Sequence, residues 1–136
     1  AADKNPDLRT IMDFHLEWTK IHGDTIPFAQ TALLVKKSLA HRSPALVIEY
    51  LENLRVSVER VNRNPDEAAR LIVAHAILPD TLIAKKAIPG SHIDFSYAWD
   101  RRKGIQEYYR IFYNFNPLIL GNKLPDENFY FRKDKE

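Results

Sequence analysis

The chain has 136 residues, of which 45% are hydrophobic and 11% aromatic, so it is long and apolar enough for one domain with a hydrophobic core. Its 20 basic and 18 acidic residues are interspersed and leave a net charge of +2, which argues against the concentrated basic stripe of nucleic-acid-binding proteins. The absence of cysteine excludes disulfides, thiolate metal sites and cysteine nucleophiles. Apolar runs such as residues 71–78 are far shorter than the roughly 20 residues that cross a bilayer.

The first predicted element is a helix over about residues 7–22. Apolar side chains recur there every three or four positions, which is the spacing of one helix face. Asn5 is the expected N-cap, Pro6 fits the first turn, and Gly23 supplies the end of the helix.

A strand is predicted next, over residues 29–35. This run is rich in apolar and β-branched side chains, and it is bounded by Pro27 and by the charged pair Lys36-Lys37. A lone strand leaves its backbone donors and acceptors without partners. The strand therefore indicates a fragment of a larger fold, an oligomer, or a strand exchanged between chains.

Two helices in a hairpin follow the strand. Ser43-Pro44 opens a helix that reaches about residue 62, with an apolar stripe on one side and charged residues on the other. Asn64-Pro65 begins the second helix, which extends to about residue 76 or 78. Glu67 stands where a capping box would bring its side chain back to the Asn64 amide.

The last third of the chain contains a short helix over residues 81–87, a brief extended piece at 92–96, and a long helix over about 98–115 with an aromatic face. Pro117 and Pro125 prevent this helix from continuing, although the sequence after it remains apolar. We therefore expect the chain to wrap back onto a core, and the whole chain to be predominantly α-helical with one or two strands.

No catalytic or metal-binding motif is visible. His15 and His22 are two helical turns apart, too distant to share an ion directly, and no other pair of histidines has the spacing of a zinc site. The sequence has no glycine-rich phosphate loop and no serine in a strained Gly-x-Ser-x-Gly turn. Aromatic residues at 108–115 fit core packing better than a ligand cage. We predict no catalytic residue, no metal ligand and no cofactor.

The order of several short motifs resembles a known family. These motifs are Ile26-Pro27, Ala32-Leu33-Leu34-Val35-Lys36-Lys37, Ser43-Pro44, Asn64-Pro65-Asp66-Glu67-Ala68-Ala69, Ala87-Ile88-Pro89, and the terminal stretch from Pro117 to Phe131. Together they resemble the C-terminal half of ABC-transporter solute-binding proteins of the nitrate, sulfonate, taurine and thiamine-precursor type. The resemblance covers almost the whole chain.

The resemblance implies an α/β fold of the periplasmic-binding-protein type, type II, in which two lobes close over a small solute. A complete member is about twice as long, so residues 1–136 would be a single C-terminal fragment of a two-lobe protein. Residues 1–28 would be a remnant of the second lobe, and residues 29–136 would return to the first lobe. The partners of the predicted strand would then belong to the missing half.

Three candidate ligand-binding residues follow from this placement: Phe28, Gln30 and Thr31. A side chain at a crossing between lobes faces the cleft, and amide or hydroxyl groups can bond a polar solute. The alternative is that these side chains only pack or cap the strand.

The family further implies a non-enzymatic function and specific partners. These would be a small-molecule solute and the membrane permease subunits of an ABC importer, with no nucleic acid, and the fragment itself could form a homo-oligomer or exchange a strand. The location would be periplasmic or extracytoplasmic, with or without a lipid anchor on the missing N-terminal part.

Two other functions compete with the importer hypothesis. A self-contained helical protein-interaction module would dock its aromatic C-terminal helix on a partner and would need no strand. An enzyme of the thiamine-precursor branch is disfavoured, because that branch depends on a cysteine-rich motif and this chain has no cysteine.

Overall fold

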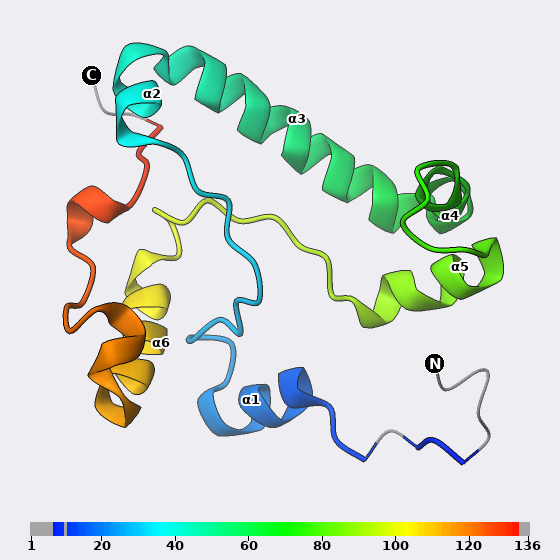
Figure 1. Cartoon of the computed structure of the whole chain (residues 1–136), viewed down its shortest axis with the longest axis horizontal. Helices are drawn as coiled ribbons and strands as arrows, with labels where there is room; N and C mark the ends of the chain where they lie inside the picture. Colours follow the sequence, from blue (N-terminus) through cyan, green and yellow to red (C-terminus); the bar gives the residue numbers. More distant parts are fainter. Residues whose placement is uncertain (1–6, 10, 134–136) are drawn as a thin grey trace. The chain divides into compact units, whose positions relative to one another are not determined.

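The computed structural model describes residues 7–9 and 11–133, and its regular elements are helices (Figure 1). They are α1 (Phe14–His22), α2 (Lys37–Arg42), α3 (Pro44–Arg63), α4 (Pro65–Ala74), α5 (Thr81–Gly90), α6 (Arg102–Phe115), and the 3-10 turns η2 (Pro117–Leu120) and η3 (Glu127–Phe129). The described part of the chain contains no strand. The α/β fold class, with its periplasmic-binding-protein topology, is therefore wrong for this chain, which is helical.

The predicted strand at residues 29–35 is a segment without regular secondary structure. Its backbone from residue 30 to 35 makes no backbone-to-backbone hydrogen bond with the rest of the described chain. The brief extended piece expected at 92–96 does not form a strand either: residue 92 lies in a turn and residues 93–96 have no regular structure. The physical reason is that a single segment cannot form a ladder, and residues 7–9 and 11–133 offer no second strand.

The chain divides into two compact units, which we describe separately. One combines Ala1–Leu33 with Ala98–Phe131, and the other combines Leu34–Tyr97 with Arg132–Glu136. The first unit is thus built from two stretches that lie far apart in the sequence.

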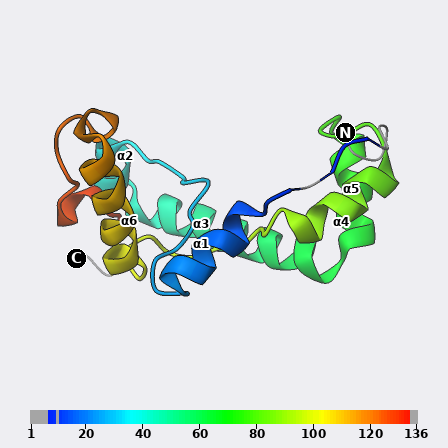
Figure 2. The ribbon, with the colours of Figure 1, turned by 90° about the horizontal axis from the view of Figure 1, so that it is seen from below.

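In the second unit, α4 and α5 pack together beside one end of α3 (Figure 1 and Figure 2). Small side chains allow the close approach: Ala68 and Ala69 on α4 and Ala84 on α5 are buried, together with Ile88. The two predicted helices are confirmed as α3 and α4, each of which carries proline at its start, but they meet at the end of α3 and α4 packs mainly on α5.

The capping details differ from the prediction. Asn64 makes no side-chain cap hydrogen bond, and Glu67 accepts from the guanidinium of Arg60 on α3 instead of reaching back to the Asn64 amide. The start of α5 has a clear cap, because the Asp80 carboxylate accepts from the amides of Leu82 and Ile83 at 2.8 and 3.0 Å.

In the first unit, α1 begins at Phe14, later than predicted. Asp13 accepts from the Leu16 amide at 3.1 Å and so sets the start of the helix. The expected caps Asn5 and Pro6 lie outside the described residues. Gly23 ends the helix as predicted, with φ at 62°, a conformation that favours glycine.

The end of the first unit turns back towards α6, but Leu118, Ile119 and Phe129 remain exposed, so the predicted covering of the apolar ending is only partial. The Asn116 side chain accepts from the Leu118 amide at 3.1 Å and starts the turn η2, which packs beside α6 (Figure 1). Further on, the ring of Phe129 contacts the ring of Tyr109 on α6, with 6.2 Å between centroids, and Tyr130 is buried. The apolar ending is therefore partly covered by α6.

Many large apolar side chains remain exposed on both units. The most exposed include Ile11 at 95%, Phe115 at 85% and Leu34 at 78%. Buried hydrophobic residues in the described chain are few and mostly small. Exposed apolar surface of this extent is typical of a surface that another protein segment covers.

Among the described residues, no helix combines the length and the hydropathy needed to cross a membrane.

Candidate functional site

Phe28 is half-buried in an aromatic cluster that we define by His15, Trp18, Phe28, Tyr108 and Phe112. Its ring centroid lies 5.6 Å from that of Trp18 and 6.3 Å from that of His15. The indole N–H of Trp18 donates to the Ile26 carbonyl at 2.8 Å, which fixes the turn that leads to Phe28. Phe28 is thus held in place by α1 and offers only part of its ring to a ligand.

Gln30 and Thr31 lie two and three residues further along, and both are exposed. The neighbouring Ala29 carbonyl accepts from the Tyr108 hydroxyl at 3.4 Å, which is the contact nearest to them that connects this stretch to α6. The amide of Gln30 and the hydroxyl of Thr31 are therefore accessible to a polar molecule. Of the three candidate residues, only Phe28 packs against other side chains, whereas Gln30 and Thr31 are exposed.

The aromatic cluster also affects Tyr108. Burial, and to a lesser extent the neighbouring Tyr109, raises the pKa of the Tyr108 phenol. The phenol therefore stays neutral at ordinary pH and acts as a hydrogen-bond donor. The cluster can pack against an apolar or flat ligand group, whereas its Trp18 N–H is already used within the chain.

A second group of interacting side chains, the Glu52 cluster, consists of Glu52, Arg55, Tyr97 and Lys133. One oxygen of the Glu52 carboxylate accepts from the Tyr97 hydroxyl at 2.6 Å and from the Lys133 ammonium at 2.8 Å. Its other oxygen accepts from Arg55 Nε at 3.0 Å. All four residues belong to the second unit.

These contacts change the ionisation of the Glu52 cluster. Hydrogen bonds from Lys133, Tyr97 and Arg55, in that order, lower the pKa of Glu52 to about 2. The bond to the Glu52 carboxylate is also the main reason why the pKa of Tyr97 is raised. A carboxylate so strongly held as an anion is a poor general acid or base near neutral pH, so the Glu52 cluster is suited to holding α3, Tyr97 and Lys133 together.

Only one contact of the Glu52 cluster has a signal in the local sequence. Glu52 and Arg55 are three positions apart on α3, a spacing that places two side chains on the same helix face. Tyr97 and Lys133 lie 45 and 81 residues from Glu52 in the sequence, and no local pattern connects residues at such separations.

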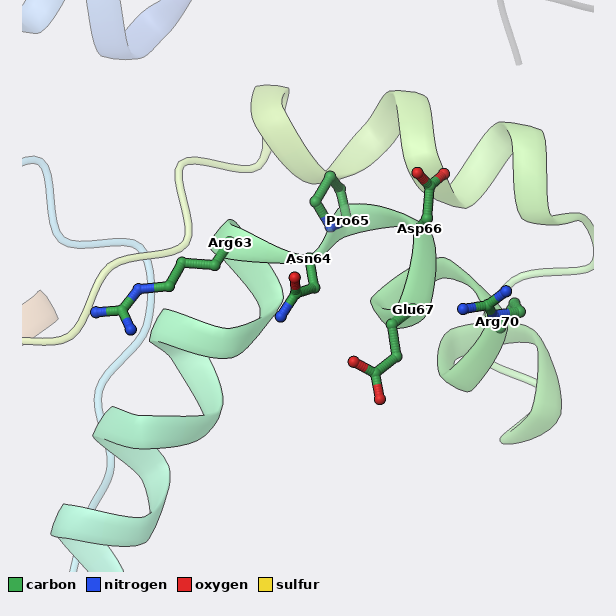
Figure 3. Close-up of a pocket in the computed structure, with 6 residues that line it drawn as sticks. All are labelled: Arg63, Asn64, Pro65, Asp66, Glu67 and Arg70. Carbon is green, nitrogen blue, oxygen red and sulfur yellow. The ribbon is translucent and has the colours of Figure 1, made fainter.

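An open hollow of about 340 Å³ lies where α3 meets α4 (Figure 3). Its lining residues are Arg63, Asn64, Pro65, Asp66, Glu67 and Arg70. Arg63 points away from Glu67 and Arg70, and the two acidic side chains are paired elsewhere, Asp66 with Lys85 at 2.6 Å and Glu67 with Arg60. The hollow therefore has mixed charges that do not converge on one point, which is a poor arrangement for a small charged ligand.

Within residues 7–9 and 11–133, no three histidine, aspartate or glutamate side chains are grouped closely enough to hold a metal ion.

Comparison of the chain with protein-family models, with curated proteins and with solved structures found no match.

Proposed function

We propose that this chain forms part of the solute-binding component of an ABC importer, of the class that serves nitrate, sulfonates, taurine and thiamine precursors. The order of motifs along the sequence supports this function. The structural observation that carries it is the stretch of residues 26–36, which has no helix or strand and exposes Leu33 and Leu34. Its backbone from 30 to 35 makes no backbone-to-backbone hydrogen bond within residues 7–9 and 11–133. Such a stretch favours a chain that works together with a further protein surface.

In this proposal the solute contacts come from the beginning of that stretch. Phe28, held by Trp18, supplies a fixed ring face, and Gln30 and Thr31 supply an amide and a hydroxyl that solvent can reach. These groups suit a small polar solute with an acceptor or donor group and a flat or apolar part. The remaining contacts would come from the surface that covers residues 30–35.

The test is calorimetry on the longer gene product that contains this chain, titrated with nitrate, taurine, an alkylsulfonate and a thiamine-precursor pyrimidine. We expect one of these solutes to bind the longer protein and none to bind the isolated chain tightly. The variants Gln30→Ala and Thr31→Val should each weaken binding several-fold, because each removes a hydrogen bond to the solute. Asn53→Ala, which changes an exposed amide on α3, is the matched control and should leave the affinity unchanged.

Equal affinity of the isolated chain and the longer protein would contradict this proposal. So would full affinity in the Gln30→Ala and Thr31→Val variants.

A helical protein-interaction module is the second candidate function, and the end of α6 favours it. Phe115 is 85% exposed and Leu118, three positions later in the sequence, is 72% exposed, so two large apolar side chains near the end of α6 face solvent. A module that docks there would lose its partner protein in the double variant Phe115→Ser/Leu118→Ser and would keep it in Gln30→Ala. The importer function predicts the opposite sensitivity for solute binding, so the two variants together separate the candidates.

A further inference from the structure

The segment that follows α1, residues 24–33, makes no backbone-to-backbone hydrogen bond with the described part of the chain, so side chains have to hold it. Two aromatic side chains donate to its carbonyls. The Trp18 indole N–H donates to the Ile26 carbonyl at 2.8 Å, and the Tyr108 hydroxyl donates to the Ala29 carbonyl at 3.4 Å. The segment is therefore held at two points, one on each side of residue 28.

The two donors pack against each other. The ring centroids of Trp18 and Tyr108 are 5.2 Å apart, and the Trp18 ring also lies 5.6 Å from that of Phe28. Gly104 lies one helical turn before Tyr108, on the same face of α6. A Cβ atom added at Gly104 would lie 2.5 Å from the Thr25 carbonyl oxygen, so glycine lets α6 lie directly against the start of the segment.

Tyr108 is the last of these anchors before two of the candidate solute residues. Gln30 and Thr31 are exposed and make no hydrogen bond with other described residues. Their position therefore depends on where the Ala29 carbonyl is held. Burial raises the pKa of the Tyr108 phenol, so its hydroxyl keeps the proton that it donates to this carbonyl.

We propose that Tyr108 is a positioning residue for the candidate solute site: its hydroxyl, by holding the Ala29 carbonyl, fixes the direction in which the chain presents Gln30 and Thr31. A segment that is already ordered loses less conformational entropy when a solute binds, so the hydroxyl raises affinity without touching the solute. This effect on binding rests on the function proposed above, whereas the positioning itself can be measured without solute.

Tyr113 provides a matched control on the same helix. Its hydroxyl also donates to a backbone carbonyl at 3.4 Å, that of Asn122, which lies in the turn after η2. Tyr113→Phe therefore removes the same kind of hydrogen bond at a different place. Tyr108→Phe keeps the ring that packs on Trp18, so we expect both variants to have the helical content of the unaltered chain in circular dichroism.

Nitrogen-15 relaxation of the whole chain without solute tests the positioning. In Tyr108→Phe we expect the order parameters of the amides at positions 29–31 to fall towards the values below about 0.6 that flexible backbone shows. In Tyr113→Phe they should equal those of the unaltered chain. Unchanged order parameters in Tyr108→Phe, or an equal fall in both variants, would refute the positioning role.

Calorimetry on the longer gene product extends the test to binding, with nitrate, taurine, an alkylsulfonate and a thiamine-precursor pyrimidine as probes. For the solute that binds, Tyr108→Phe should weaken the affinity about three- to tenfold, and Tyr113→Phe should leave it unchanged. In the background Gln30→Ala/Thr31→Val, Tyr108→Phe should have no further effect, because Tyr108 acts only through these two residues. A further loss of affinity in this background would contradict the positioning role.

The two proposals fail separately. If none of the four solutes binds the longer protein, the importer function is wrong, and the order parameters of the chain without solute still decide whether Tyr108 positions the segment. If a solute binds and the order parameters do not change in Tyr108→Phe, only the positioning role is wrong.

Discussion

At Glu52, one side chain from the middle of α3 connects three parts of the second unit. Its carboxylate accepts hydrogen bonds from Arg55 on the same helix, from Tyr97 and from Lys133. The ammonium of Lys133 also lies 5.5 Å from the centre of the Tyr97 ring, so the cation is held by both partners. Removing the negative charge of Glu52 would weaken all these contacts together.

The pH dependence of stability should reveal this arrangement. The pKa of Glu52 is lowered from 4.5 to about 2 in the folded chain, so the ionised carboxylate stabilises the fold above about pH 4.5. This contribution decreases as the pH falls from about 4.5 towards 2, because the unfolded state then takes up the proton first. We expect Glu52→Gln to lower the melting temperature at pH 7 and the difference from the unaltered chain to shrink towards pH 2.

Glu107→Gln is the matched control for this measurement. Glu107 makes a single exposed ion pair with Arg110 on α6, and pairs of this kind contribute little to stability. A constant melting difference between the unaltered chain and Glu52→Gln from pH 7 to pH 2 would show that the Glu52 cluster does not stabilise the fold through its charge.

Among the helices, α6 is positioned by a close approach to the loop that follows α1. A Cβ atom added at Gly104 would lie 2.5 Å from the Thr25 carbonyl oxygen and 2.8 Å from Pro27 Cδ, both closer than atoms in van der Waals contact. Glycine at this position therefore lets the loop lie directly against the helix. The Trp18 contacts with Tyr108 and with the Ile26 carbonyl stabilise the same junction.

Gly104→Ala should destabilise the first unit by about 1–3 kcal/mol, because either the loop or the helix must move. Helix propensity alone predicts the opposite, since alanine is favoured over glycine inside a helix by about 1 kcal/mol. Gly90→Ala is the control, because nothing lies within 4 Å of its added Cβ, and we expect it to be neutral or slightly stabilising. Urea unfolding followed by circular dichroism, which reports on the helices of both units, measures both variants, and a stabilised Gly104→Ala variant would exclude the close approach.

The helices could be predicted from the sequence to different degrees. The apolar stripe of α3 and the prolines at the first positions of α3 and α4 can be recognised in the local sequence, and both helices form as predicted. The start of α1 was placed too early because the apolar spacing begins before Asp13, whose side chain caps the helix. The strand at 29–35 was wrong because its composition favours pairing, whereas the formation of a ladder depends on a second segment that local sequence does not reveal. Among the three candidate ligand-binding residues, only Phe28 contacts side chains of a helix, namely His15 and Trp18 on α1. No local sequence pattern indicates that Phe28 would contact these two residues.

For the molecule as a whole, exposed apolar surface is the dominant feature. Side chains such as Leu34, Phe115 and Leu118 face solvent, while the core of the second unit is formed mainly by alanines and Ile88. Because apolar burial is the main source of folding stability, we expect a marginally stable chain. Association that covers part of this surface should add to its stability.

A melting temperature that rises with protein concentration is the expected result for the whole chain. Association that covers exposed apolar side chains would stabilise the folded state by mass action. Differential scanning calorimetry over a hundred-fold range of concentration would measure it. A melting temperature independent of concentration in the unaltered chain would contradict this expectation.

The contact between Trp18 and Tyr108 has a consequence for synthesis on the ribosome. The Tyr108 hydroxyl also reaches the Ala29 carbonyl, and these two residues are 79 positions apart in the sequence. At about 5–20 residues per second, the ribosome needs roughly 4–16 s to make that length of chain. Throughout this interval Trp18 and Phe28 have emerged but their partners on α6 have not. The first unit therefore stays incomplete during this interval, whereas the second unit has its long stretch from Leu34 to Tyr97 in place before most of α6 is made and lacks only its short C-terminal piece.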